Sequence, residues 1–182
     1  RSQFSKIRKE IRLKKKVQKI LLIFGGTDDE NITRKILPYF FNKKYDISVV
    51  LGPSYKFEQE LKNKILKKEF IKIIKNEENI AKLFAKHDLV ISSSGITAYE
   101  LSCLGIPSIF IPMDEYQAKT SSGLEKMGFG IDYGFWDDDF NKLEKIITKI
   151  SDYSVREKMF FSGRELVDGL GSNKILDEIL IL

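Results

Sequence analysis

The sequence predicts an α/β protein, with a Rossmann-like parallel sheet of about six strands and helices on both faces. Short, continuous apolar runs such as residues 19–24 and 89–92 lack the alternation of half-exposed strands, which is typical of strands buried on both faces. Segments with helical spacing alternate with these runs along most of the chain. Small residues at 93–95 provide a tight strand-to-helix turn. At 182 residues, the chain is long enough for one domain with a substantial core.

The expected strands are apolar runs that end at turn residues. The first covers residues 19–24 and ends at Gly25-Gly26, and the second covers residues 46–51 and ends at Gly52-Pro53. The later strands are expected at residues 70–74, 89–92 and 108–111, with a short edge strand within 129–134.

The segments between the strands have apolar residues at helical spacing. Asp28 or Asp29 is placed to cap a helix over residues 31–42, in which Pro38 predicts a kink or an early end. The next helices are expected at residues 55–67, 76–86, 97–104 and within 113–128, the last ending at Gly128. Three closing helices are expected at residues 137–150, 154–166 and 172–180.

The net charge of +5 is concentrated at the start of the chain, where residues 1–19 hold nine Lys or Arg and one Glu. A nucleic-acid arm, a patch for an anionic membrane and a solvated linker or helix all fit this composition. We favour a basic interdomain linker or helix over 1–18, followed by one domain over 19–182, and keep peripheral membrane association as an alternative. Aromatic residues do not interleave with the basic ones, so we expect no nucleic-acid partner.

Composition also excludes several classes of protein. There is no apolar run of the roughly 20 residues that a membrane span needs, and no signal peptide is visible, so we expect a cytoplasmic protein. Cys103 lies among apolar residues and is expected to be buried and inert. His87 is the only histidine, so no zinc site is expected, and the acidic run 137–139 is expected to cap a helix rather than bind a metal.

One segment carries the features of a nucleotide site. Ser94, Gly95, Ile96 and Thr97 lie where a strand turns into a helix, so their N–H groups point at one spot at the positive helix end. No Lys follows the Gly, so this is not the phosphate loop of ATPases. Glu100, one turn later, suits a ribose diol. A phosphate site next to a diol acceptor indicates a nucleotide, although plain helix capping is the alternative.

Two further segments follow strands at the same predicted edge of the sheet. Gly25 and Gly26 come directly after the first strand, where two glycines let a ligand approach the backbone. The third Gly of the GxGxxG fingerprint is missing, so NAD binding is disfavoured. Gln117 begins a helix after the fifth strand, and its amide is placed to reach the same edge; a helix-surface Gln is the alternative.

These segments together resemble the C-terminal lobe of the two-lobed (GT-B) nucleotide-sugar enzymes of glycosyltransferase family 28 type. The resemblance runs from about Lys19 to Gly130 and rests on ILLIFGGTDDEN, VVLGPSY, LVISSSGITAYELSCLGIPSIFIP and the YQ-led helix. Within that group the chain most resembles the UDP-sugar hydrolase of pseudaminic acid biosynthesis and the spore-coat polysaccharide biosynthesis proteins.

The resemblance implies a UDP-sugar as substrate, no cofactor and no metal. It implies that Ser94, Gly95, Ile96 and Thr97 hold the diphosphate, that Glu100 binds the ribose, that Gly25, Gly26 and Thr27 line the sugar-phosphate side, that Ile74 and Asn76 meet the uracil, and that Gln117 contacts the donor sugar or phosphate. Relatives often have Asn-Ala a few residues after the Gln, where this chain has residues 119–122 (KTSS), so the identity of the sugar stays open.

The catalytic residues are unknown from this sequence, because in this family the base lies in a Gly-rich loop with a His in the N-terminal lobe. The chain begins with Arg1 rather than Met, so we expect it to be part of a longer protein. The predicted function is the UDP-sugar-binding C-terminal domain of a nucleotide-sugar hydrolase or glycosyltransferase in surface polysaccharide or nonulosonic acid biosynthesis. The alternatives are a stand-alone glycosyltransferase subunit with a membrane-bound partner and a non-catalytic nucleotide-binding module.

Overall fold

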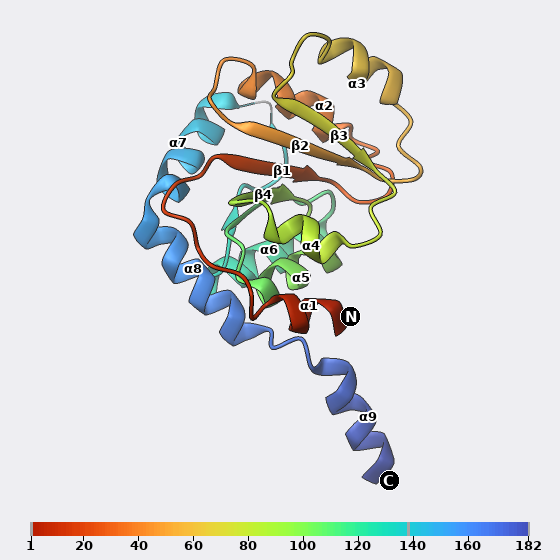
Figure 1. The fold of residues 1–182 in the computed structure, drawn as a ribbon, viewed down its shortest axis with the longest axis vertical. Coiled ribbons are helices and arrows are strands. Elements are labelled where there is room, and N and C mark those ends of the chain that lie inside the picture. The colour runs from red at the N-terminus through yellow and green to blue at the C-terminus, as the bar shows by residue number, and fades with distance from the viewer. Residues whose placement is uncertain (1, 138, 182) are drawn as a thin grey trace.

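The computed structural model describes residues 2–137 and 139–181, and within them six parallel strands form one sheet (Figure 1). The strands are β1 (Lys19–Ile23), β2 (Asp46–Leu51), β3 (Ile71–Lys75), β4 (Leu89–Ser92), β5 (Ser108–Phe110) and β6 (Ile131–Asp132). They lie in the order β3-β2-β1-β4-β5-β6, which is the order of doubly wound nucleotide-binding sheets. The predicted fold class is therefore confirmed.

Burial explains why the central strands are continuous apolar runs. Every residue of β4 is buried, as are Ile20 to Ile23 of β1, because helices cover both faces of the sheet there. The two strands pair in register, with Leu22 opposite Ile91. Nearer the edge, β2 alternates between buried and partly exposed residues, since one of its faces is less well covered.

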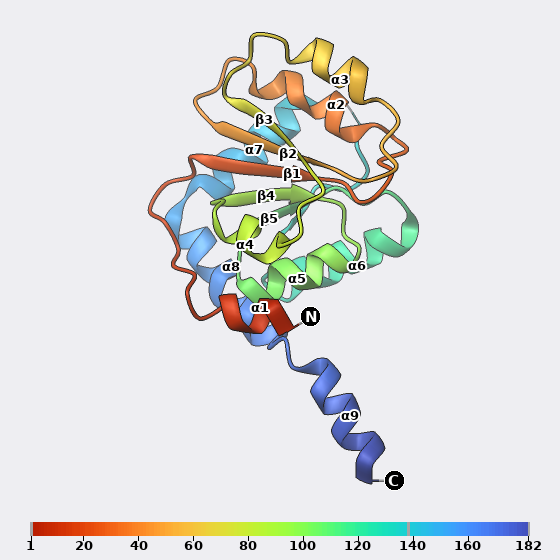
Figure 2. The same cartoon turned by 45° about the vertical axis from the view of Figure 1, so that its right-hand side comes forward.

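The helices form two layers, as Figures 1 and 2 show. Their bounds are α1 (Ser2–Ile7), α2 (Ile32–Ile36), the 3-10 helix η1 (Leu37–Phe40), α3 (Glu58–Lys64), α4 (Ile80–Ala85), α5 (Ile96–Leu104), α6 (Glu115–Lys126), α7 (Phe140–Ser151), α8 (Tyr153–Leu166) and α9 (Gly171–Ile181). One layer contains α2, η1, α3 and α7, and the other contains α1, α4, α5, α6 and α8. Helix α9 leads away from the rest of the chain in both views.

Local chemistry sets the helix ends. The helix expected over 31–42 ends as an α-helix at Ile36 and continues as η1, since Pro38 cannot donate the next helical hydrogen bond. Helix α4 is shorter than the predicted 76–86, because Asn76 has a left-handed φ of 52° and Asn79 caps the helix by accepting from Lys82 N at 3.0 Å.

Asp139 caps α7 by accepting from the backbone N–H groups of Asn141 and Lys142. The acidic run 137–139 therefore contributes a helix cap, as its composition predicts. Residue 138 of this run lies outside the described part of the chain.

The amino-terminal segment corrects one expectation. Residues 1–18 were predicted to be a linker or helix outside the domain, but Phe4, Ile7 and Ile11 are buried in the core, and α1 packs on α4 and α5. Residues 8–18, which we call the strap, then run along the domain to β1 (Figure 1). The basic composition of residues 1–18 gave no sign of this packing. The few apolar side chains of the segment are buried only because α4 and α5 pack against them. The boundary with any further lobe stays a prediction.

Long-range hydrogen bonds hold the strap in place. Arg8 donates to the carbonyls of Cys103 (3.1 Å) and Val167 (2.6 Å). The fully buried Arg156 donates to the carbonyls of Lys14 (2.7 Å) and Lys15 (2.8 Å). The strap is therefore fixed through its backbone, which leaves its lysine side chains exposed. No helix in the described residues has the length and apolarity to cross a membrane.

Candidate functional site

The order of the strands predicts where a ligand binds. The chain leaves β1 toward β2 on one side and passes from β4 to β5 on the other, so the loops after β1 and β4 diverge at the carboxyl edge of the sheet. Ligands of open α/β sheets bind at such a switch point. The structure brings both predicted motifs there, because β1 and β4 are hydrogen-bonded neighbours that end at Ile23 and Ser92.

The loop after β1 is open and backbone-rich. Gly25 has a left-handed φ of 75°, and no atom lies within 4 Å of the position where a Cβ of Gly25 or Gly26 would be. The glycines are exposed, as is Thr27, whose hydroxyl donates to Asp29 Oδ2 at 2.9 Å. Asp28 is buried and accepts from the N–H groups that begin α2. Burial is the main reason that its pKa is raised above 3.8.

The loop after β2 packs against the Gly25–Gly26 loop, which we call the glycine loop. The sequence analysis did not include the loop after β2 in the site. A Cβ on Gly52 would lie 2.2 Å from Gly26 O and 2.4 Å from Gly25 O, so only glycine fits there. Ser54 N–H donates to Gly26 O at 3.1 Å. Tyr55 donates to Asn31 Oδ1 at 2.7 Å, and burial raises the pKa of Tyr55 to about 12. The Gly52-Pro53 pair after a strand was the available signal.

The amino-terminal end of α5 presents free donors. Gly95 is the N-cap and no side chain caps this helix. Within the described residues, the N–H groups of Gly95, Ile96 and Thr97 have no hydrogen-bond acceptor. Ala98 N–H bonds to Gly95 O at 3.0 Å, which begins the helix. Three unpaired N–H groups at a positive helix end can bind an oxyanion.

Ser94 and Gln117 lie together at the carboxyl edge of the sheet and bond to each other. Ser94 N–H donates to Gln117 Oε1 at 3.1 Å, and the Ser94 hydroxyl donates to Gln117 O at 2.8 Å. Gln117 Nε2 donates to Asp114 Oδ2 at 3.2 Å. Ser94 is 1% exposed, so its N–H is not available to a phosphate in this arrangement. The pair instead fixes the turn after β4 against the start of α6.

The remaining predicted residues lie at the same edge. Glu100 is half-buried on α5, one turn after Ile96, whose side chain is 76% exposed. Ile74 is near the end of β3, and Asn76 follows it with a left-handed φ of 52°. Since β2 separates β3 from β1, the Asn76 loop is about 10 Å from the glycine loop, which is within reach of one extended ligand.

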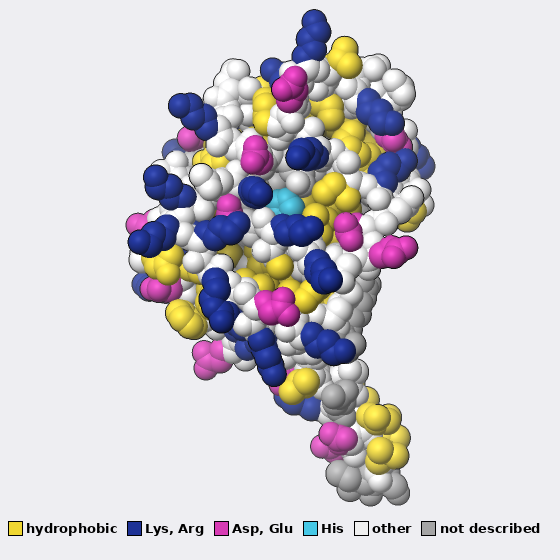
Figure 3. Space-filling view, in the orientation of Figure 1, with side chains coloured by type: hydrophobic (Ala, Val, Ile, Leu, Met, Phe, Trp, Pro, Cys, Tyr) yellow, Lys and Arg dark blue, Asp and Glu magenta, His cyan; other side chains and the backbone are white. Residues whose placement is uncertain are grey.

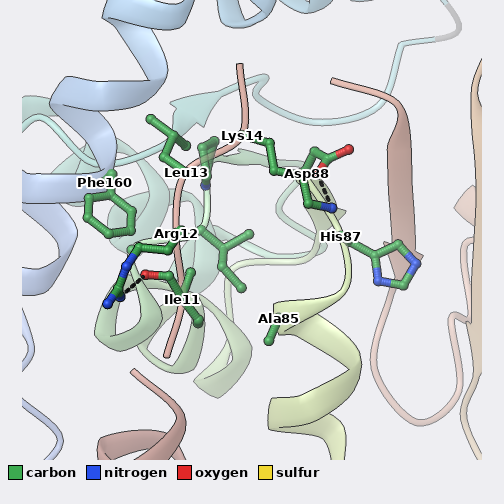
Figure 4. Close-up of a pocket in the computed structure, with 11 residues that line it drawn as sticks. Ile11, Arg12, Leu13, Lys14, Ala85, His87, Asp88 and Phe160 are labelled. Atoms are coloured by element: carbon green, nitrogen blue, oxygen red, sulfur yellow. Dashed lines mark hydrogen bonds and ion pairs between the residues drawn. The ribbon is translucent and has the colours of Figure 1, made fainter. Parts of the chain in front are cut away.

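Two further titratable groups, Asp88 and His87, lie at the opposite edge of the sheet. Asp88 accepts from Gln18 N and Lys19 N at 2.9 Å and pairs with Lys14 Nζ, as Figure 4 shows for the pair with Lys14. Burial opposes ionisation of Asp88, but these contacts outweigh it and hold its pKa below 3.8. His87, which precedes β4, is therefore also far from the ligand edge and is no candidate base there.

The arrangement can bind and stabilise an anion, but it offers little for proton transfer. No group of three His, Cys, Asp or Glu side chains placed to hold a metal occurs among the described residues. Glu100 is the one predicted site residue with an ionisable side chain. The carboxyl edge of β1 and β4 is thus suited to holding an anionic ligand.

Comparisons with known proteins agree with this geometry. The spore coat polysaccharide biosynthesis protein SpsG of Bacillus subtilis is 28% identical over 174 residues, which are 92% of this chain and 51% of that protein. The UDP-N-acetylglucosamine–N-acetylmuramyl-(pentapeptide) pyrophosphoryl-undecaprenol N-acetylglucosamine transferase of Aquifex aeolicus is 28% identical over 154 residues, which are 78% of this chain and 44% of that protein. The chain thus spans about half the length of these relatives.

The fold is shared with a solved GT-B enzyme. The crystal structure of MurG from Acinetobacter baumannii superposes with a TM-score of 0.75 and 15% identity, covering 98% of this chain and 53% of that one. The sequence profile of the glycosyltransferase family 28 C-terminal domain matches residues 2–159, which include α1, the strap and every strand of the sheet. The fold is therefore that of a GT-B lobe, and this chain belongs to the glycosyltransferase family 28 C-terminal domain family.

Proposed function

We propose that this chain binds the UDP part of a nucleotide sugar at the carboxyl edge of β1 and β4, and that the protein containing it transfers the sugar. The observation that carries the proposal is the set of unpaired N–H groups on Gly95, Ile96 and Thr97 at the switch point of the sheet. Glu100 lies one turn further along the same helix, and we assign it to the ribose diol.

Each predicted site residue has a role in this proposal. The N–H groups of Gly95, Ile96 and Thr97 and the Thr97 hydroxyl hold the diphosphate, and Glu100 holds the ribose. Backbone groups from Ile74 to Asn76 contact the uracil. Gly25, Gly26 and Thr27 line the sugar-phosphate side of the site. Ser94 orients the turn through Gln117. The Gln117 amide keeps one N–H beyond its bond to Asp114, and that N–H is directed to the donor sugar.

The chemistry assigned to this lobe is stabilisation of the leaving group. As the anomeric C–O bond breaks, the bond electrons pass to the UDP oxygen, and the negative charge develops on the diphosphate. Donors that are already oriented at the end of α5 stabilise that charge without reorganising. The base that deprotonates the acceptor is assigned to an N-terminal lobe of the same protein, since the described part of this chain offers none at the site.

The names of the relatives favour a UDP-sugar donor and an acceptor in surface polysaccharide synthesis. They also favour transfer over hydrolysis. Hydrolysis of a UDP-sugar in pseudaminic or another nonulosonic acid pathway would use the same donor site with water as the acceptor, and it remains the second candidate on sequence resemblance alone. Action with a separate membrane-bound partner, and membrane association through the strap, are further proposals consistent with the exposed strap lysines.

Calorimetric titration of the chain with UDP, UDP-N-acetylglucosamine, NAD and ATP tests the donor site. We expect UDP and its sugar to bind, and Glu100→Gln to weaken both by about 1–3 kcal/mol, because the ribose loses a charged hydrogen-bond acceptor. The matched control is Glu157→Gln, which removes an exposed carboxylate from α8 and should leave the affinity unchanged. Equal affinity in the wild type and Glu100→Gln, or binding of NAD in place of UDP, would contradict the proposal.

Incubating the longer protein with a UDP-sugar separates the two reactions. Release of UDP with free sugar in the absence of any acceptor identifies a hydrolase. Release that depends on an added acceptor identifies a transferase.

A further inference from the structure

A hollow of about 430 Å³ lies at the amino edge of the sheet, opposite the proposed UDP site. Lysine, serine and histidine side chains line it from the starts of β1, β2 and β3 and from the residues that follow α4: Lys19, Ser48, Lys72, Lys86 and His87. We call this site the basic hollow. Because four segments that are distant in sequence contribute to it, the fold itself brings these side chains together. None of them takes part in the proposed UDP site.

The floor of the basic hollow is fixed by hydrogen bonds. One ring nitrogen of His87, Nδ1, lies 2.8 Å from Leu83 O, an acceptor, so this nitrogen carries a proton. The other, Nε2, lies 2.8 Å from Ser48 Oγ. In the neutral ring, Ser48 donates to Nε2; in the charged ring, Nε2–H becomes a donor. Figure 4 shows the His87 ring directed away from the Asp88–Lys14 pair, on the other side of the chain.

The rim of the basic hollow carries unpaired positive charge. Lys19, Lys72 and Lys86 are exposed, and none of them forms an ion pair with another residue that the structure describes. Asp46 and Glu69 also line the hollow, so the three lysines outnumber the acids there. In Figure 3, Lys and Arg side chains gather around the single histidine on this face.

The surroundings of His87 favour the neutral form of its ring. Burial is the main cause that lowers its pKa below 6.5, and the charges of Lys19 on β1 and Lys14 on the strap lower it further. The Leu83 carbonyl on α4 and the Asp88 carboxylate act in the opposite direction. Lys72 and Lys86 also line the hollow, as do the acids Asp46 and Glu69. An anion placed among these lysines would favour the charged ring, which would then supply a further donor.

We propose that the basic hollow is a second binding site, and that it takes a phosphate-bearing anion held by the ammonium groups of Lys19, Lys72 and Lys86 with Ser48 and His87 at the base. Ammonium groups act as adaptable point charges for phosphate oxygens, and a hydroxyl adds a directed donor. The phosphate can belong to a soluble compound or to an anionic lipid headgroup, since both present the same oxygens. This inference goes beyond the proposed function, because the two sites lie at opposite edges of the sheet.

Proton NMR of the imidazole tests the proposal, because His87 is the only histidine of the chain and gives one ring signal without assignment. The chain, freed of any histidine tag, is titrated with pH in pyrophosphate and in sodium chloride of equal ionic strength. We expect pyrophosphate to raise the pKa of His87 by about half a pH unit or more, as a charge within several ångströms does at high dielectric.

Two double variants show whether the effect belongs to the basic hollow. Lys72→Ala/Lys86→Ala removes two of its ammonium groups and should abolish the rise in the His87 pKa. Lys145→Ala/Lys149→Ala removes the same charge from exposed positions of α7 and should preserve it. All four lysines are exposed, so we expect both variants to fold. An equal rise in the two variants would show general screening and overturn the proposal.

Vesicle sedimentation identifies the source of the phosphate. Vesicles of phosphatidylglycerol with phosphatidylcholine are compared with vesicles of phosphatidylcholine alone. We compare the fraction of protein that sediments with the anionic vesicles. If this fraction is at least threefold lower for Lys72→Ala/Lys86→Ala than for Lys145→Ala/Lys149→Ala, the result supports a lipid headgroup, even if pyrophosphate has no effect. A pyrophosphate response alone supports a soluble phosphate compound. No change of the His87 signal with pyrophosphate and no selective sedimentation would overturn the proposal.

Discussion

Gly52 is the point at which the loops after β1 and β2 come closest. The Cβ of an alanine at this position would lie 2.2 Å from Gly26 O, 2.4 Å from Gly25 O and 2.4 Å from Gly26 C. All three atoms belong to the backbone, so no flexible side chain can move aside. The Gly25–Gly26 loop, which lines the proposed donor site, would have to shift by the better part of an ångström.

We therefore expect Gly52→Ala to destabilise the chain. Forcing a methyl group into a packed region costs about 1–3 kcal/mol. For a chain of 182 residues, 2 kcal/mol corresponds to a fall in Tm of about 4–8 °C. Because the displaced atoms belong to the glycine loop, the affinity for UDP should fall as well, even at temperatures where the variant is folded.

Gly26→Ala is the matched control, since it makes the same change in the same pair of loops. No atom lies within 4 Å of its added Cβ, and its φ is outside the left-handed region. Its Tm should stay within about 2 °C of the wild type, because an alanine there is unstrained. Its UDP affinity should nevertheless fall if the ligand approaches the Gly26 backbone closely, which separates a ligand contact from a structural role.

Differential scanning calorimetry and UDP titration of the three proteins complete the test. An unchanged Tm for Gly52→Ala would refute the steric argument. An equal loss of stability in both variants would show that the loop tolerates no added methyl group, whatever its surroundings. Unchanged UDP affinity in both variants would remove the glycine loop from the donor site.

Two further predictions concern the strap. Asp88 has its pKa held below the unfolded value, so its contribution to stability is present above pH 3.8 and is lost as the pH falls through the lower, folded pKa. Asp88→Asn should lower the free energy of unfolding in urea by about 1–3 kcal/mol at pH 7, and this difference should narrow at acid pH; a pH-independent difference would contradict the linkage. Arg156→Met leaves the carbonyls of Lys14 and Lys15 without their donors, so trypsin should cleave the strap faster, whereas Lys158→Met on the exposed side of α8 should leave the cleavage rate unchanged.

The sheet could be predicted from sequence because its signals are local. The run over 19–24 is apolar without alternation; it forms β1 (Lys19–Ile23), and Phe24 directly after the strand is buried as well. Pro38 marked the end of α2 through its own covalent structure. In each case the residues that determine the element lie within a few positions of one another. The element can therefore be predicted without knowing which other segments pack against it.

The features that sequence reasoning missed depend on distant partners. The N–H of Ser94 donates to the side chain of Gln117, which lies 23 residues later. The close approach of Gly52 to Gly26 depends on how two loops meet. The composition of the strap predicts a solvated linker. In the structure, Arg156 donates to the backbone carbonyl of Lys14, which lies 142 residues earlier in the chain. No local pattern encodes such pairings.

The long-range hydrogen bonds of the strap also determine when it can dock during synthesis of the chain. Arg8 is synthesised before its acceptor Val167, which lies 159 residues later in the chain. Since domains fold as the chain emerges, the strap must wait until α8 has left the ribosome, while β1 through β4 already have their partners. Closure of such long-range contacts is slow. The last step in forming this domain is therefore expected to be the docking of its first residues.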